Sequence, residues 1–277
     1  MTTQTHEQTQ EAWDNIATGY DQFVTPTHLW LAQEGLRFAG LRAGDRFLDV
    51  AAGSGALSIP AARLGAKVTS VDISPVMLAR LKARAARDRF DLETRKMDGC
   101  ALEFEDNTFD VAGSQFGVML FPDMPRGICE MARVIKPGGR ILMTVYGAPQ
   151  QIEFFRFFVT AIQTVVPEFT GPPMNPPPLP FQLQDPERLR KELINVGLKQ
   201  VNVATIQEKL EFVSGQQLWD WLLNSNPIVG SVLAELHLKP EQFDKVRQAL
   251  NRMIRERGGD SGRAILTNPI NLGVGTK

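Results

Sequence analysis

The chain has 277 residues, of which 43% are hydrophobic and 22% are charged. This composition is enough to bury a sizeable core, either as one large domain or as one domain with a cap. The formal net charge of -1 provides no basic excess, which argues against nucleic acid or an anionic membrane as the main partner.

Targeting and redox features of the sequence are sparse. The two cysteines, Cys100 and Cys129, are too few for a disulfide framework or a metal cluster, so we expect no metal and a reducing cytoplasmic location. The N-terminal stretch MTTQTHEQTQEAWDN is polar and has no apolar core of a signal peptide. No apolar run approaches the ~18 residues of a membrane span, and nothing in the sequence indicates an oligomeric state.

The first half of the chain alternates predicted helices and strands. Helical spacing of apolar residues predicts helices over 8–18 and 27–39, and another begins at Ser74-Pro75 with serine as the N-cap. Further helices are expected over 54–65 and 127–135. Strands are expected over 46–51, 67–73, 92–98, 108–116 and 140–147. Such alternation predicts parallel βαβ units in an open α/β sheet.

The second half changes character after residue 150. A helix is expected over 154–166, a proline-rich loop over 171–180, a helix from Asp185-Pro186 and a strand over 199–206. Residues 215–257 resemble three helices without a strand between them, and 263–275 form a closing strand. The three helices are therefore expected as an insertion between the last two strands.

Three acids end successive strands of this predicted sheet. Asp49 precedes the glycine turn of Gly53 and Gly55, Asp72 follows the second strand and Asp98 the third. Ligands of open α/β sheets bind at the carboxyl ends of strands, so these acids outline a slot for a nucleoside. The acid beside the turn would repel a pyrophosphate but suits the positive charges of S-adenosylmethionine (SAM). The dinucleotide fingerprint also fails, because Ser58 stands where its last glycine would be.

The same residues resemble a known family, the class I SAM-dependent methyltransferases. LDVAAGSG, VDISPVML and ARVIKPGGRILM match its motifs, and the subgroup most resembled contains the ubiquinone and menaquinone C-methyltransferases and their small-molecule relatives. Ala51 departs from the glycine of most of the wider family. The resemblance implies a Rossmann-like seven-stranded sheet of order 3-2-1-4-5-7-6, with helices on both faces, a helical lid and an antiparallel last strand. It also implies SAM as cofactor and S-adenosylhomocysteine as product.

The resemblance carries roles onto individual residues. Asp49 would face the methionine amine, directly or through water. Gly53 and Gly55 would contact the methionine part through their backbone, and Asp72 would hold the ribose. The adenine would meet Ile73, Met77, Asp98 and Gly99; Gln115 would close the site; and Tyr20 would reach the methionine carboxylate. Together with Ala51 these are the eleven predicted cofactor residues. Simpler interpretations stay open: Asp98 as a turn acid, and Tyr20 and Met77 as core residues.

The predicted domains follow from these assignments. We expect a helical lid at 1–40, a SAM-binding core at 41–150, the rest of the core with a proline-rich lid loop at 151–214, a helical insertion at 215–258 and a final strand at 259–277.

The acceptor site is less defined by the sequence. Phe116 and Tyr146 follow the fourth and fifth strands and should face the transferred methyl group. No catalytic residue is identified; His28 is a weak candidate base, and a surface histidine at a helix entry is the favoured interpretation. We expect methylation of a small, partly apolar acceptor on oxygen, nitrogen or carbon, largely by positioning. A SAM-binding regulatory protein without turnover, or an enzyme that methylates RNA or protein, is the alternative.

Overall fold

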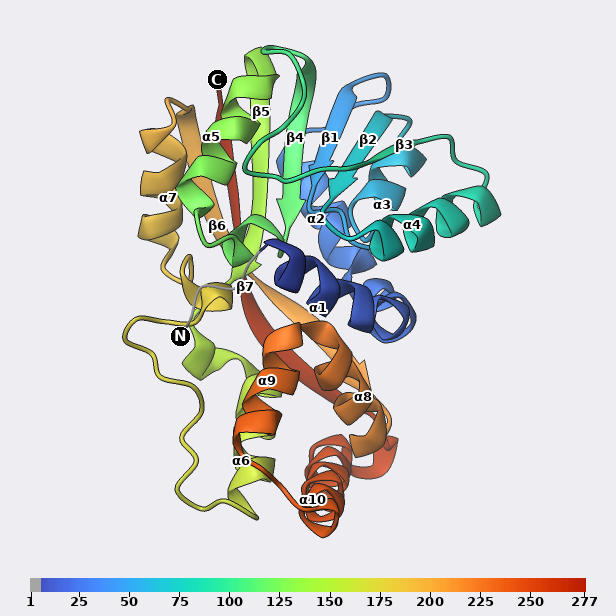
Figure 1. The fold of residues 1–277 in the computed structure, drawn as a ribbon, viewed down its shortest axis with the longest axis vertical. Coiled ribbons are helices and arrows are strands. Elements are labelled where there is room, and N and C mark those ends of the chain that lie inside the picture. Colours follow the sequence, from blue (N-terminus) through green and yellow to red (C-terminus); the bar gives the residue numbers. More distant parts are fainter. Residues whose placement is uncertain (1–5) are drawn as a thin grey trace.

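A seven-stranded sheet organises the computed structural model, which describes residues 6–277 (Figure 1). The first five residues of the predicted lid lie outside this range. The strands are β1 (Arg46–Val50), β2 (Lys67–Asp72), β3 (Glu93–Lys96), β4 (Phe109–Gln115), β5 (Ile135–Tyr146), β6 (Lys199–Phe212) and β7 (Ala264–Thr276). Their order is β3-β2-β1-β4-β5-β7-β6, and β7 is antiparallel to both neighbours. The predicted fold class and strand order are confirmed.

Both faces of the sheet are covered because successive strand residues point to opposite sides. Phe47 packs with residues of α2 (Leu29–Phe38) and α3 (Ser58–Arg63) on one face. Leu48, its neighbour, packs with residues of α5 (Met124–Val134) and α7 (Pro186–Asn195) on the other. The fully buried central strands therefore present their carboxyl ends, rather than a face, to any ligand.

Helix boundaries follow local capping chemistry. The Ser74 side chain accepts a hydrogen bond from the Met77 backbone at the start of α4 (Pro75–Arg87), as its sequence predicts. Asp185 caps α7 in the same manner. The helix expected over 54–65 begins only at Ser58, because Gly53 and Gly55 have φ of 53° and 96° and hold the preceding residues in turns. The third strand ends at Lys96, two residues before Asp98.

The last two strands continue beyond the rest of the sheet. β5 pairs with β7 only as far as Tyr146↔Ile270, whereas β6 and β7 stay paired to Phe212↔Ala264. The strand expected to end at residue 206 thus runs six residues further, because β7 supplies it with a partner. We call residues 207–212 and 264–269 the ribbon extension.

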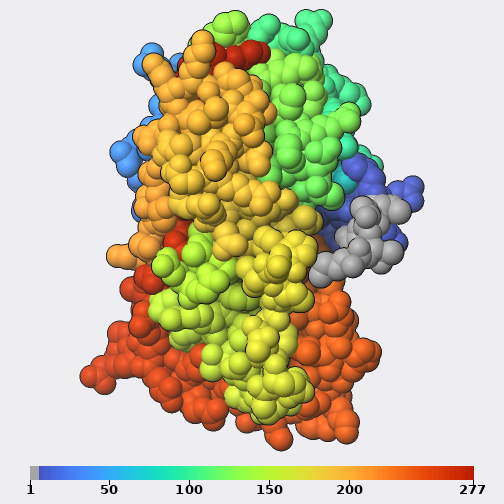
Figure 2. Space-filling view, turned by 90° about the vertical axis from the view of Figure 1, so that its left-hand side faces the viewer, coloured from blue at the N-terminus to red at the C-terminus, as the bar shows by residue number. Residues whose placement is uncertain are grey.

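Four helices gather around the ribbon extension. They are α6 (Glu153–Gln163), α8 (Gly215–Ser225), α9 (Pro227–Glu235) and α10 (Pro240–Gly258), which form the lower half of Figure 1. Three of them pack on its strands, and α9 packs on a neighbouring helix. A second apolar cluster joins Phe212 and Leu266 to Phe158, Trp221 and Leu250 of these helices. The proline-rich loop, yellow in Figure 2, lies at the surface beside α6.

The N-terminal segment lies at the carboxyl edge of the sheet, between it and the lower helices (Figure 1). It comprises α1 (His6–Gly19) and two short helical turns, Tyr20–Val24 and Thr25–His28. Side chains fasten it to α4: Ser74 Oγ donates to Asp14 at 2.5 Å, and Arg84 forms an ion pair with Asp21. Among the described residues, no helix combines the length and apolar character needed to cross a membrane.

Candidate functional site

Asp49 is buried at the end of β1, beneath the glycine turn. The Ser58 hydroxyl donates to its Oδ2 at 2.5 Å and also lies 2.8 Å from the Ser70 hydroxyl. Its Oδ1 has no hydrogen-bond partner among the described residues. Burial raises the pKa of Asp49 to about 7, although the hydrogen bond from Ser58 opposes this effect. A positively charged group placed beside Oδ1 would stabilise the ionised form.

Asp72 is fixed by backbone donors from both sides. Its Oδ2 accepts from the Gly53 amide and its Oδ1 from the Ser74 amide, each at 2.8 Å. Burial raises the pKa of this carboxyl to about 6, while the two amide bonds lower it. Asp72 therefore joins the glycine turn after β1 to the start of α4, and its position is set by both.

A cavity of about 390 Å³ lies between these residues and the N-terminal segment. We call it the cofactor slot. Of the eleven predicted cofactor residues, nine line it: Tyr20, Ala51, Gly53, Asp72, Ile73, Met77, Asp98, Gly99 and Gln115. The other two, Asp49 and Gly55, are not among its lining residues. A Cβ on Gly55 would stand 2.3 Å from Leu81 of α4, so this glycine allows helix packing rather than contact with a ligand in the slot.

The structure adds lining residues that the sequence did not single out. Trp13 of α1 contacts the edge of Tyr20, with ring centroids 6.1 Å apart, and both rings line the slot. Phe121 and Arg126 close the end near Gly99, where a Cβ would meet the Phe121 ring at 2.5 Å. The shared helical face of Trp13 and Tyr20 is the signal that could have identified Trp13.

Ala51 adopts a backbone conformation that favours glycine. Its φ is 58°, and it lies directly before the glycine turn. Its methyl group occupies the space where Gly117 would place a Cβ, since the two positions are 2.5 Å apart. The departure from the usual glycine is thus accommodated by a glycine elsewhere in the chain.

A second, narrower cavity of about 100 Å³ adjoins the slot and shares Trp13, Tyr20, Phe116 and Leu120 with it. We call it the aromatic cavity. The three predicted pocket residues His28, Phe116 and Tyr146 all line it, and the rings of Phe116 and Tyr146 stack with centroids 4.5 Å apart. Further walls come from Phe154, Phe155 and Phe158 of α6 and from Pro172, Pro178 and Pro180 of the proline-rich loop. Within residues 6–277, its lining includes no Lys, Arg, Asp or Glu.

Glu208 is a buried acid that the sequence did not identify. It belongs to the ribbon extension and is 1% exposed. Its Oε1 lies 3.7 Å from Nε2 of His28, which is itself 2% exposed. The predicted surface alternative for His28 is therefore wrong. Alternation along β6 carried a signal, because Glu208 shares a strand face with Leu210 and Phe212.

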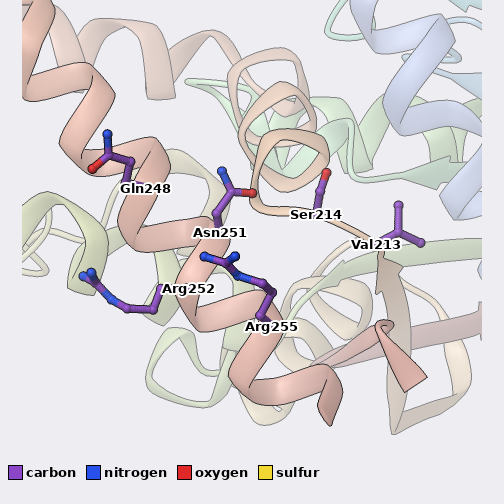
Figure 3. Close-up of a pocket in the computed structure, with 6 residues that line it drawn as sticks. All are labelled: Val213, Ser214, Gln248, Asn251, Arg252 and Arg255. Carbon is purple, nitrogen blue, oxygen red and sulfur yellow. The ribbon is translucent and has the colours of Figure 1, made fainter. Parts of the chain in front are cut away.

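Another hollow lies at the far end of the ribbon extension, between α8 and α10 (Figure 3). Arg252 and Arg255 line it together with Ser214 and Asn251, and the Asn251 side chain accepts from the Gly215 amide at 2.8 Å. It shares no lining residue with the slot or the aromatic cavity. In the described part of the chain, no group of three or more His, Cys, Asp or Glu side chains could hold a metal ion.

Comparison with known proteins identifies a family model and individual relatives that each match part of this chain. A family model described as a methyltransferase domain matches residues 48–143. An uncharacterized protein of Mycobacterium tuberculosis is 47% identical over 103 residues, which are 37% of this chain and 38% of that protein. Demethylmenaquinone methyltransferase of Tropheryma whipplei is 32% identical over 158 residues, 54% of this chain and 64% of that protein. The matches thus span less than two thirds of these relatives.

Solved structures share the fold over more of the chain. Phosphoethanolamine N-methyltransferase 2 of Haemonchus contortus, solved with phosphomonomethylethanolamine and S-adenosylhomocysteine, superposes with a TM-score of 0.59 at 19% identity. That match covers 99% of this chain and 60% of the other. At this identity the likeness concerns the fold alone.

Proposed function

We propose that this chain, which carries a class I SAM-dependent methyltransferase domain, transfers the methyl group of SAM to a small, partly apolar acceptor held in the aromatic cavity. The domain match and the demethylmenaquinone methyltransferase relative confirm the family resemblance and the cofactor class. The acceptor, and the atom that receives the methyl group, belong to the proposal.

The shared wall of the two cavities is the observation that carries the proposal. Methyl transfer is an in-line displacement, which requires the acceptor atom and the sulfonium to meet without water between them. Trp13, Tyr20 and Phe116 border both cavities, so ligands in the two would meet at these rings. The aromatic lining suits a small molecule with a flat, apolar body.

The chemistry of the slot fits SAM. The buried Oδ1 of Asp49 has no partner within residues 6–277 and matches a cationic amine behind the turn. Asp72 would hold the ribose hydroxyls, and Asp98 with Gly99 the adenine edge. Ile73 and Met77 offer apolar contacts, while Tyr20 and Gln115 would close the methionine end. SAM, once bound, supplies an electrophilic methyl group; the chain's contribution is binding, orientation and exclusion of water.

We also assign parts to the segments. Residues 6–40 and the proline-rich loop would act as lids on the core, and 215–258 would be an insertion that walls the acceptor side. The alternatives are a SAM-binding protein without turnover and methylation of RNA or protein. Neither is favoured by a specific observation, and the aromatic cavity lacks the basic lining expected for a nucleic-acid acceptor. The free Cys100 and Cys129 support a cytoplasmic location.

Ligand-dependent stability tests the cofactor assignment. SAM and S-adenosylhomocysteine should raise the melting temperature of the full chain, whereas NAD should not, because binding to the folded state alone stabilises it.

Asp72→Ala should weaken SAM binding by about 1–3 kcal/mol through lost charge-assisted hydrogen bonds. The exposed Asp91→Ala is the matched control. A larger shift with NAD than with SAM would overturn the assignment, and turnover of labelled SAM over a metabolite panel separates an enzyme from a binding protein.

A further inference from the structure

Behind the aromatic cavity lies a group of buried polar atoms without hydrogen-bond partners. Both ring nitrogens of His28, Oε1 of Glu208 and Oδ1 of Asn268 are unpaired within residues 6–277. A buried polar atom left unpaired costs about 1–3 kcal/mol, so several of them in one place require an explanation. Of these side chains only His28 lines the aromatic cavity, so a molecule bound there could supply a hydrogen-bond partner to its imidazole.

These side chains form a line that leads away from the cavity. His28 lines the cavity, with its ring 4.9 Å from that of Phe116 and 6.1 Å from that of Trp221. Nε2 of His28 faces Oε1 of Glu208 at 3.7 Å. On the far side of Glu208, Asn268 of β7 donates to Oε2 at 3.3 Å. The aromatic contacts fix the imidazole plane, and the ribbon extension fixes the carboxylate behind it.

Burial sets the charges of this pair. It raises the pKa of Glu208 to about 8 and lowers that of His28 to about 4, so each side chain alone prefers its neutral form. Among the described residues, Tyr20 and Tyr146 are the other titratable groups that interact electrostatically with Glu208, and burial raises the pKa of both, which keeps them neutral. Once Glu208 is ionised, its carboxylate favours the neutral tautomer of His28 that carries the proton on Nε2, since this N–H then faces the carboxylate. Nδ1 is then the nitrogen that can accept a proton, and the resulting ion pair has no net charge.

Resting on the proposed function, we propose that His28 is the general base for the methyl acceptor and that Glu208 is its positioning residue. The acceptor is accordingly a neutral molecule with a weakly acidic hydroxyl of the phenol type. An anionic acceptor such as a phosphate ester is disfavoured, because no Lys or Arg is found in the described lining of the cavity. A cationic amine is disfavoured because the carboxylate lies behind the imidazole rather than in the cavity.

The proposed step balances without a further reactant. The hydroxyl proton of the acceptor passes to Nδ1 of His28, and an electron pair of the oxygen forms the new bond to the methyl carbon. The carbon–sulfur bond of SAM breaks with its electron pair retained by sulfur, so the sulfonium becomes a neutral thioether. The positive charge leaves as the proton on His28, beside the Glu208 carboxylate.

Methyl transfer from labelled SAM to paired phenols and anilines tests the proposal with the full-length chain. The pairs are phenol with aniline and 4-methylphenol with 4-methylaniline, whose phenols stay largely protonated over the assay range of pH 6 to 9.5. We expect transfer to the phenols, with kcat rising through a pH near the Glu208 pKa of about 8. His28→Gln should lower kcat by about 100-fold or more with little change in the KM for SAM. Glu208→Gln should lower kcat about tenfold and remove the inflection.

Two matched controls carry the same side-chain changes at exposed positions. His237→Gln, and Glu211→Gln on the same strand as Glu208, should leave the profile unchanged. Transfer to the anilines that survives His28→Gln would overturn the proposal while leaving the methyltransferase assignment intact. Absence of transfer to every acceptor, despite SAM binding, would instead count against the proposed turnover.

Nitrogen-15 histidine spectra give a test that needs no acceptor. His28 should remain neutral above pH 5.5, its proton should settle on Nε2 as the pH rises through the Glu208 pKa of about 8, and Glu208→Gln should abolish that change of tautomer. A His28 that titrates near 6.5 and does not respond to Glu208→Gln would overturn the pair directly.

Discussion

At the scale of single residues, the buried carboxyl of Asp49 lowers the stability of the folded state when it is ionised. Its pKa is raised from 3.8 to about 7, so the folded state binds more protons than the unfolded state between these values. Stability therefore falls as pH rises through this window, and the penalty is fully present above pH 7. A shift of about three units corresponds to up to about 4 kcal/mol.

Replacing Asp49 by asparagine removes that penalty while retaining an acceptor for Ser58. Without ligand, Asp49→Asn should be more stable than the parent at pH 8, and the difference should shrink at pH 5. SAM affinity should fall in the same variant, because the methionine amine loses its counter-charge. Denaturant unfolding at the two pH values, with calorimetric SAM binding, measures both effects. A variant that is less stable than the parent at pH 8 would contradict this account of Asp49.

Ala51 and Gly117 should be energetically coupled. Gly117→Ala would force a methyl group to within 2.5 Å of the Ala51 Cβ and 2.8 Å of the Ser114 hydroxyl, so we expect a loss of about 1–3 kcal/mol. Ala51→Gly should lie within about 1 kcal/mol of the parent, since relief of its positive φ offsets the greater freedom of glycine when unfolded. The double variant should recover part of the loss, because Ser114 still contacts the new methyl group. Additive free energies in a double-mutant cycle would argue against this coupling.

At the scale of elements, α4 holds the N-terminal segment over the cofactor slot. Arg84 contributes an ion pair to Asp21 and also donates to the Asp21 backbone carbonyl at 3.1 Å. Arg84→Met should raise the open population of the segment about fivefold, for about 1 kcal/mol of lost interaction, and lower SAM affinity only in proportion to the closed population that is lost. Hydrogen exchange over residues 6–28 measures the opening. Arg87→Met, on the same helix but ion-paired with its neighbour Asp88 rather than with Asp21, is the control and should change both quantities much less.

Elements differ in how far the sequence determined them. The buried strands β1, β2 and β4 are short apolar runs with turn residues at their ends, and the Ser74 and Asp185 caps are local signals, so all of these were predictable. The ribbon extension was not, because residues 207–212 form a strand through pairing with β7, which lies more than fifty residues further along the chain. Glu208 and Asn268 meet across that pairing. The residues proposed to bind the cofactor could be placed from motifs, whereas the proposed base and its partner meet only through long-range register.

At the scale of the whole molecule, the N-terminal segment borders both the cofactor slot and the aromatic cavity. Trp13 and Tyr20 lie in the N-terminal segment and border the cofactor slot and the aromatic cavity together. A movement of the segment that admits a ligand to one of these two cavities therefore also opens the other to solvent. The two exchange steps are linked by geometry rather than by any contact between the ligands.

This linkage has a kinetic consequence. Under the proposed function, methyl donor and acceptor would have to be loaded into a ternary complex before the segment closes, and both products would wait for the same reopening. If reopening limits turnover, added sucrose should slow the parent in proportion to solvent viscosity. His28→Gln, whose chemical step would be slow, should be insensitive to sucrose and would serve as the internal reference. Equal sensitivity in both proteins would indicate a diffusive artefact; insensitivity of the parent would place its slowest step at the methyl transfer itself.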